Sequence, residues 1–461
     1  MRRPGKPRSL AGAGGFRESA SSPPGGWLDV AWGVDASVDA RGVTGGLASE
    51  LLPVAADLVE VAAAVHTADR LTRRTPPSLD PYGLSWRRTL SVRVGVRCRP
   101  SWSRREVRQC LTELLKWLSG DAWRLDFRDN DGPAPTDDGR GFLFTSFPQD
   151  PFDVCLISGG LDSTAGLAVH LDRAPDRRVL AVSVATNTRM ASVQERTLAH
   201  LCRRRGPRVQ PVTYWLQMRR PPAETTQRTR AFVFLAAGAA VALTAGKREL
   251  TVFENGIGAY NLPYVRSQIG PMATRAMHPR TLALFARLVS LLANSPFSVT
   301  NPSLWLTKAE LLSTVSDADS DALVSSVSCD FGFASRVGGG RLCGRCTSCL
   351  LRRQSLLAAG LAAVDAADDY RLDVCAGQPS YLPELDAMVW QVVRLRAALA
   401  DHRPWPRLVR AFPELLDAPA ATLEDGRTQL IRLYRTYCAE WSAVQSILAP
   451  TVSPRPEPGR A

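Results

Sequence analysis

A glycine-rich loop between an apolar strand and a helix is the feature that most constrains the fold. Residues 153–158 (DVCLIS) are typical of a buried strand, and residues 163–171 have the apolar spacing of a helix. The loop that joins them reads Ser158-Gly159-Gly160-Leu161-Asp162-Ser163. Adjacent glycines let the backbone approach an anion closely, and a helix N-terminus offers unpaired N–H groups with a partial positive charge. The sequence therefore predicts a phosphate-binding loop that opens a β/α unit.

The chemistry of this loop favours one kind of phosphate reaction. No lysine follows the glycines as a Walker loop requires, so γ-phosphoryl transfer is disfavoured and a pyrophosphate leaving group is favoured. Asp162 is a candidate to hold magnesium or to orient the phosphates. An ordinary glycine turn without a ligand is the alternative. The candidate nucleotide-binding residues of the loop are Ser158, Gly159, Gly160, Leu161, Asp162, Ser163 and Thr164.

Short apolar strands alternate with helices from residue 152 onward. The expected strands are Asp153–Ser158, Val179–Ala185, Val209–Trp215, Leu250–Glu254 and Phe297–Val299. The expected helices cover residues 163–171, 191–204, 229–246 and 279–293. This rhythm predicts an α/β fold with a doubly wound parallel sheet, covered by helices on both faces. Such sheets bind ligands at the carboxyl ends of their strands.

Composition shifts divide the chain into four predicted parts. Residues 1–25 read as a disordered basic leader, and residues 26–150 as an α+β domain. In that domain the strand Thr89–Cys98 precedes a helix with capping-box spacing at Ser103 and Glu106, and then a second strand. Residues 151–355 form the phosphate-loop domain. Residues 356–461 are expected to be helical, with a proline-rich disordered tail from Pro450.

Four cysteines have the spacing of metal ligands. Cys343, Cys346 and Cys349 form C-x2-C-x2-C, and Cys329 lies upstream, which predicts a zinc knuckle over residues 329–349. An iron–sulfur cluster is the alternative. Ten cysteines without an apolar export signal indicate reduced thiols rather than a disulfide scaffold.

The charge balance is basic but does not require a nucleic-acid partner. Lys+Arg is 57 against 44 for Asp+Glu, a net charge of +13. Only four of these cations are lysine, and the arginines are scattered, which points to coding bias as much as to a phosphate-binding patch. The longest apolar run, Ala231–Gly246, is too short to span a bilayer comfortably and predicts a buried helix. We therefore expect a soluble cytoplasmic protein with no membrane partner, for which nucleic-acid binding stays possible.

Two motifs resemble one enzyme family. SGGLDS resembles the PP-loop of the ATP pyrophosphatases of HUP type, which split ATP between the α and β phosphates and adenylate their substrate. CGRCTSCLLRRQSL is similar to the CGxCxSCxxR segment of the 7-cyano-7-deazaguanine synthases. Residues 301–310 (NPSLWLTKAE) look like the PLxxxTKAEI segment of that family, and residues 230–235 resemble its RNxxFL helix start, with Ala231 in place of asparagine. The resemblance covers about residues 152–355.

The resemblance implies an ATP-dependent C–N ligase with ATP, Mg²⁺ and Zn²⁺. It implies catalytic roles for Asp162, Ser163 and Lys308. It also places Arg230 at the nucleotide, and Arg352 at a substrate carboxylate or the phosphates. Glu254 and Asn255 directly follow a predicted strand, where a substrate would bind, and are candidate substrate residues on that ground.

Each of the weaker assignments has a structural alternative. Thr307 and Glu310 have capping-box spacing, and the alternative for Arg230 is that it only flanks a buried helix. Glu254-Asn255-Gly256 is also a good turn, and the alternative for Arg352 and Arg353 is that they cap the helix of the knuckle. His278, before Pro279, is interpreted as structural.

The long architecture resembles the deazaguanine-synthase-like proteins of bacterial antiphage operons of the Qat type. That resemblance implies a protein partner from the same operon. It also implies that the nitrogen captured by the adenylate comes from ammonia or from a protein or nucleic-acid amine. A tRNA-modifying PP-loop enzyme and a non-catalytic ATP-binding subunit remain alternatives.

Overall fold

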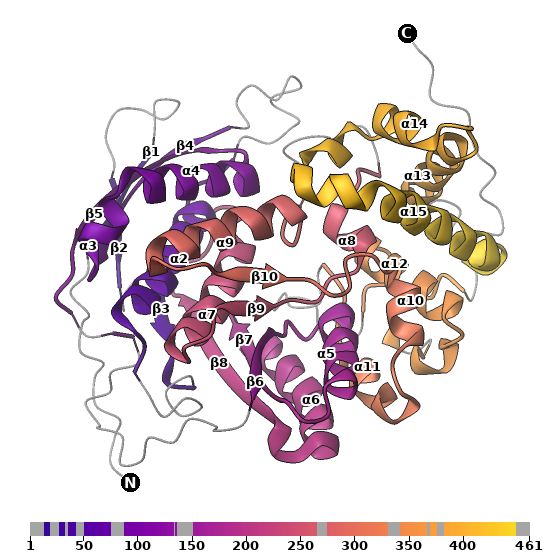
Figure 1. Cartoon of the computed structure of the whole chain (residues 1–461), viewed down its shortest axis with the longest axis horizontal. Coiled ribbons are helices and arrows are strands. Elements are labelled where there is room, and N and C mark those ends of the chain that lie inside the picture. Colours follow the sequence, from indigo (N-terminus) through magenta and orange to yellow (C-terminus); the bar gives the residue numbers. More distant parts are fainter. Residues whose placement is uncertain are drawn as a thin grey trace.

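A six-stranded sheet forms the centre of the protein in the computed structural model (Figure 1). The model describes residues 13–18, 27–32, 36–42, 50–74, 87–132, 134–135, 151–264, 274–330, 342–366, 369–375 and 382–448. Across the sheet the strands are β10 (Ser298–Thr300), β9 (Glu249–Thr251), β6 (Phe152–Leu156), β7 (Arg178–Ala185), β8 (Val209–Met218) and β3 (Ala36–Asp39). The first five are parallel, and β3 pairs antiparallel with β8 at the edge.

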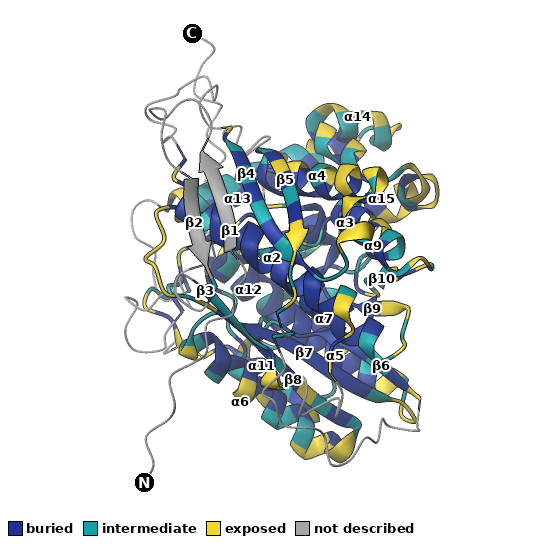
Figure 2. Cartoon of the chain, turned by 90° about the vertical axis from the view of Figure 1, so that its left-hand side faces the viewer, coloured by how far each residue is buried: buried dark blue, intermediate teal, exposed yellow. Residues whose placement is uncertain are grey.

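Helices cover both faces of this sheet, because its side chains are apolar on both faces. Val154 and Leu156 of β6 share a core with α7 (Arg230–Thr244) and α9 (Pro279–Ala293). Cys155, between them, and Ile157 pack on α5 (Leu161–Arg173) and α6 (Thr188–Arg205) instead. The buried strands lie between these layers in Figure 2. The α/β class and the mostly parallel sheet are therefore confirmed, as is the buried helix predicted from residue 231.

The strand order creates a topological switch point. The chain runs from β6 to β7 and β8 in one direction across the sheet, then returns to β9 on the other side of β6. The connections that leave the carboxyl ends of β6 and β9 therefore go to opposite faces of the sheet. In open α/β sheets this divergence forms the crevice in which ligands bind.

A second sheet of four strands lies in the N-terminal region. Its order is β2 (Trp27–Ala31), β1 (Ala13–Glu18), β4 (Thr89–Val96) and β5 (Ala122–Asp129). The predicted strand–helix–strand is confirmed, since α4 (Arg105–Ser119) connects the parallel pair β4 and β5. The predicted capping box is wrong: α3 (Arg99–Ser103) ends at Ser103, and Arg104 precedes α4 without a side-chain cap.

Backbone pairing also corrects the expectation of a disordered leader for residues 13–18. These residues form β1, which pairs with β2 and β4, and main-chain pairing of this kind needs no apolar pattern. The rest of the predicted leader lies outside the described residues.

The domain boundary predicted near residue 150 is not a boundary of the hydrophobic core. β3 completes the central sheet, and α2 (Pro53–Leu71) packs on α7 within the same core. The physical reason is that α2 is buried on almost all sides, and such a helix needs neighbours all around it. The N-terminal region therefore helps to build the central α/β unit.

The C-terminal region is helical, as predicted. Its helices are α13 (Pro383–Leu399), α14 (Pro404–Ala411) and α15 (Ala420–Leu448), and they share a core with α8 (Gly256–Tyr260) and α12 (Thr347–Ala358). This core therefore reaches back across the boundary expected at residue 355. The predicted disordered tail lies outside the described residues. Among the helices that the structure describes, each is too short or too polar to cross a bilayer.

Candidate functional site

The glycine-rich loop forms a tight turn between β6 and α5. Gly159 has a φ of +78°, and a Cβ there would lie 3.1 Å from Val193 Cγ1, so glycine is required for both conformation and space. Ser158 Oγ accepts a hydrogen bond from Gly160 N at 3.2 Å. Gly160 is the N-cap of α5, and it has no side chain with which to cap the helix. The first turn of α5 therefore depends on groups outside the helix for its capping.

The hydroxyl groups of the loop bond within the loop. Ser163 Oγ donates to Gly160 O at 3.0 Å and lies 3.0 Å from Ser158 Oγ, while Thr164 Oγ1 donates to Gly160 O at 2.9 Å. Within the described part of the chain, the backbone N–H groups of Asp162 and Ser163 have no acceptor. These two donors, rather than the hydroxyls, are the groups free to meet an anion.

Asp162 is the centre of a cluster that three strands bring together. Its Oδ2 forms an ion pair with Lys308 Nζ, and its Oδ1 accepts from Asn255 Nδ2 at 2.9 Å. Asp162 follows β6, Asn255 follows β9, and Lys308 begins α10 (Lys308–Ser313) after β10. The cluster therefore lies at the carboxyl ends of adjacent strands, at the switch point. Asp162 and Lys308 are only 9% and 7% exposed.

Glu254 lies beside this cluster and is held by its backbone. Asn301 brackets it, accepting from Glu254 N at 3.2 Å and donating to Glu254 O at 2.8 Å. Withdrawal from water raises the pKa of the Glu254 carboxyl to about 8, and the charge of Asp162 adds to the effect while Lys308 opposes it. Glu254 therefore keeps its proton to a higher pH than an exposed glutamate does.

The raised pKa of Glu254 predicts how stability depends on pH. The folded protein keeps this proton from about pH 4.5 to pH 8, whereas the unfolded chain loses it, so the free energy of unfolding falls as the pH rises through this window. Glu254→Gln should remove the part of this decrease in unfolding free energy that Glu254 causes. Urea titrations between pH 5 and pH 8 would measure it. Glu249→Gln, an exposed position on β9, is the control. Equal pH profiles for wild type and Glu254→Gln would contradict the assignment.

Arg230 offers a second cationic group at the carboxyl edge of the sheet. It begins α7 after β8; its Nη2 lies 3.8 Å from Met190 Sδ, and its guanidinium stands over the Phe234 ring. No carboxylate of the described chain pairs with it. Burial, followed by the charge of Arg70, lowers the pKa of Arg230 to about 10. A partly buried cation without a carboxylate partner is typical of a position that binds an anion.

Arg230 and the loop flank the same end of α6. Met190 lies in the first turn of that helix, and Gln194, one turn later, donates to Ser158 O at 3.4 Å. A nucleotide that spans the start of α6 would therefore have the loop at one side and Arg230 at the other.

Arg352 is not brought to this site, which corrects its predicted role at the substrate. It is 2% exposed, its Nε donates to Asp365 Oδ1 at 3.1 Å, and its Nη1 donates to Ser326 Oγ at 2.8 Å. Its charge is neutralised inside the protein. Arg352 lies within α12, whose N-cap is Cys346, so it does not cap the helix of the knuckle either. Arg353 likewise pairs with Asp365.

Two of the structural alternatives are present. Thr307 and Glu310 form a complete capping box on α10, which orients Lys308 at the first position of that helix. His278 accepts from Arg280 N at 3.1 Å as the N-cap of α9, so its structural interpretation is confirmed.

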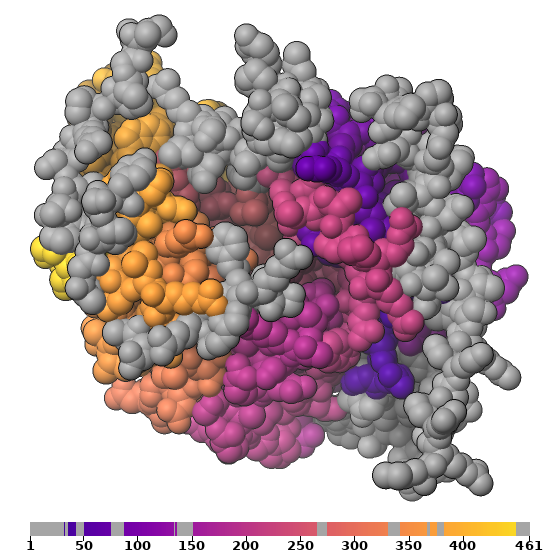
Figure 3. All heavy atoms as spheres, turned by 180° about the vertical axis from the view of Figure 1, so that it is seen from behind, coloured from indigo at the N-terminus to yellow at the C-terminus, as the bar shows by residue number. Residues whose placement is uncertain are grey.

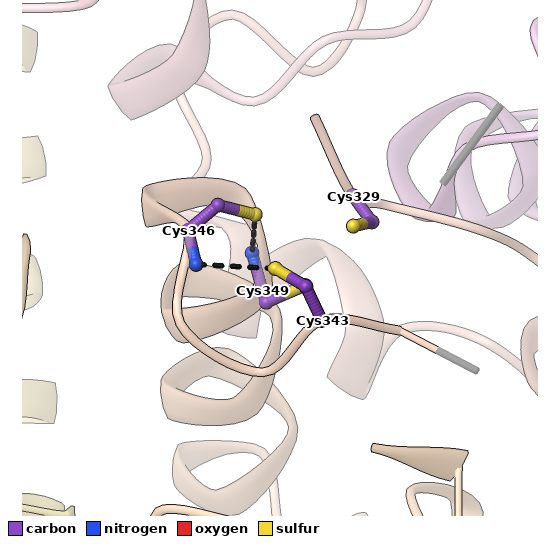
Figure 4. Close-up of side chains that lie close together, drawn as sticks. All are labelled: Cys329, Cys343, Cys346 and Cys349. Carbon is purple, nitrogen blue, oxygen red and sulfur yellow. Dashed lines mark hydrogen bonds between the residues drawn. The ribbon is translucent and has the colours of Figure 1, made fainter. Parts of the chain in front are cut away.

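The four predicted metal ligands come together (Figure 4). Their sulfur atoms all lie within 4.8 Å of one another, and the sulfurs of Cys343 and Cys349 are 3.8 Å apart. A tetrahedral ion with Zn–S bonds of about 2.3 Å holds its sulfurs about 3.8 Å apart. Cys346 N and Cys349 N donate to the sulfurs of Cys343 and Cys346. The group fits one zinc ion, whereas a cluster of several irons needs wider spacing.

The segment before the cysteine cluster bonds to the glycine-rich loop through two residues that the sequence analysis missed, Val327 and Ser328. Val327 N donates to Gly159 O at 2.9 Å, and Ser328 Oγ accepts from Leu161 N at 3.1 Å. Cys349 Sγ in turn lies 3.7 Å from Ser328 O, and Ser326 accepts from Arg352. Ser328 acts as a cap for α5 from outside the helix. The sequence feature that could have indicated this role is the position of Ser328 next to Cys329, a predicted metal ligand.

The surface seen from behind is hollowed where segments around residues 345–365 meet those around residues 160–240 (Figure 3).

Compared with models of known protein families and with curated proteins, the chain matches none.

Proposed function

We propose that this protein adenylates a carboxylate substrate with ATP, as a PP-loop ATP pyrophosphatase. The observation that carries the proposal is the cluster of Asp162, Lys308 and Asn255 at the switch point, in the same helix turn as the free N–H groups of Asp162 and Ser163. Free N–H groups suit the oxygens of pyrophosphate, and an ammonium group beside them suits the charge that develops as pyrophosphate leaves.

The proposed reaction has two steps. A carboxylate oxygen attacks the α-phosphorus of ATP, the bond to the bridging oxygen breaks, and pyrophosphate leaves with the electron pair. A nitrogen nucleophile then attacks the acyl-adenylate carbon, loses a proton and expels AMP, forming a C–N bond. Asp162 would orient Lys308 toward the phosphates, and Mg²⁺ would accompany ATP near this carboxylate. Zn²⁺ would be held by the four cysteines in a structural role.

The proposed substrate is 7-carboxy-7-deazaguanine or a close relative, on the strength of the two sequence motifs. Glu254, whose backbone Asn301 holds at the carboxyl end of β9, would contact this substrate. The nitrogen would come from ammonia or from an amine of a protein or nucleic acid, and the long architecture supports a role in antiphage defence with an operon partner. Arg230 would bind the nucleotide phosphates.

The test is pyrophosphate release from ATP with and without 7-carboxy-7-deazaguanine. We expect release that requires the acid and that falls at least 100-fold in Asp162→Asn, because that variant keeps the size of the side chain but loses its pairing with Lys308. Glu249→Gln is the control. ATP binding without acid-dependent release, with or without added ammonium, would contradict the adenylation and favour an ATP-binding subunit.

A further inference from the structure

The residue before Arg230 is held by helix α2 of the N-terminal region. Thr229 is the N-cap of α7, but its side chain does not cap that helix. Its hydroxyl donates to Asp69 Oδ2 at 2.9 Å and lies 3.1 Å from His66 Nδ1. Thr229 N also donates to Asp69 Oδ2, at 3.3 Å. Thr229 and Asp69 are both fully buried, so this contact is sheltered from competing water.

The rest of the connection from β8 is held by the same end of α2. Arg70 O accepts from Ala223 N and Glu224 N, and the Arg70 guanidinium donates to the carbonyl groups of Glu224 and Thr226. Arg74 N donates to Glu224 Oε2 at 2.8 Å. The path of residues 223–229, and so the start of α7, follows the surface of α2.

Asp69 is itself fixed as a charged acceptor. Burial alone would raise the pKa of this carboxyl, but the charges of Arg88 and Arg74 hold it below its usual value. Both arginines also pair with Asp121, next to β5. The network therefore links the four-stranded sheet to Thr229 through charged groups with defined geometry.

We propose that Thr229 and Asp69 are positioning residues for Arg230, so that the N-terminal region builds one wall of the nucleotide site. This inference rests on the proposed function, in which Arg230 binds phosphate. The sulfur of Met190 and the ring of Phe234 contact the guanidinium, but neither fixes it as a charged hydrogen bond would. The position of Arg230 is instead set by its backbone, which Thr229 anchors.

A double-mutant cycle tests the inference. The readouts are the dissociation constants of ATP and of pyrophosphate, measured by titration calorimetry well below the unfolding temperature. We expect Thr229→Val to weaken ATP binding about tenfold, because it removes the hydroxyl while keeping the shape. Thr229→Ser, which keeps the hydroxyl, should bind within twofold of wild type. In an Arg230→Gln background, Thr229→Val should have no further effect, because the residue acts through Arg230.

Thr281→Val is the matched control. Thr281 is as buried as Thr229, and its hydroxyl also bonds across the core, to Trp117 Nε1 at 2.9 Å. The Thr281→Val variant should have a lower melting temperature than wild type but should bind ATP as tightly. A loss of affinity in Thr281→Val equal to that in Thr229→Val, or an undiminished effect of Thr229→Val without Arg230, would overturn the inference and leave the proposed function intact. A wild-type protein that binds neither ATP nor pyrophosphate would overturn both.

Discussion

Replacing Lys308 with Met is expected to lower acid-dependent pyrophosphate release by about 10²- to 10³-fold. Lys308 places an ammonium group on Asp162, in the first turn of α5, where in the proposed reaction the leaving pyrophosphate would gain negative charge. Such a group contributes more in the transition state than in the ground state, so the fall should appear mainly in kcat. Initial rates of pyrophosphate release at saturating ATP measure it.

A double variant separates this chemical role from a structural one. Lys308→Met alone leaves the Asp162 carboxylate buried without its counter-ion, which should cost about 3 kcal/mol of unfolding free energy. Asp162→Asn combined with Lys308→Met should recover that stability but not the activity. Lys247→Met, whose ammonium lies 4.0 Å from the Phe152 ring centre and away from the cluster, should leave the rate unchanged. Recovery of activity in the double variant would show that Lys308 serves the fold alone.

Replacing Cys349 with Ser is expected to release the bound metal and to lower the melting temperature by about 10 °C. A structural zinc ion contributes its binding free energy to folding, and Cys349 is a fully buried ligand of the predicted site. Metal analysis should give about one zinc per wild-type chain and less than a tenth of that in the variant.

The same variant should weaken pyrophosphate binding. Cys349 contacts Ser328, whose hydroxyl accepts from Leu161 N, so loss of the metal frees the segment that shapes the loop. Cys110→Ser is the control: this cysteine is buried but lies outside the cluster, against Leu284 O. Full zinc content in Cys349→Ser would contradict the ligand assignment. Iron with visible absorption in the wild-type protein would identify the alternative cluster.

Local patterns predicted the elements that carry the site. The run DVCLIS followed by two glycines specifies a buried strand, a turn and a helix start within about 12 residues. It can do so because apolar runs and glycines determine the backbone conformation locally. β6 and α5 form there, although β6 ends at Leu156, earlier than expected. The cysteine spacing likewise predicted a group of four ligands, since a metal site imposes its spacing on the chain.

Contacts between residues that are distant in the sequence could not be predicted from these local patterns. The family resemblance predicts that Arg352 lies at the substrate, but the fold pairs it with Asp365. Ser328 has no sequence pattern of its own, and it gains its contact with Leu161 only because the knuckle packs on the loop.

The sequence by itself determined the class of the fold, the glycine-rich turn between β6 and α5, and the knuckle of Cys343, Cys346 and Cys349, because each depends on residues that are close along the chain. Only the tertiary structure decided that Asp162, Asn255 and Lys308 meet, and that α2 holds the residue before Arg230. The reason is topological. Residues from separate β/α units come together only when the strand order is set, and that order is selected by the burial of whole faces rather than by any local motif.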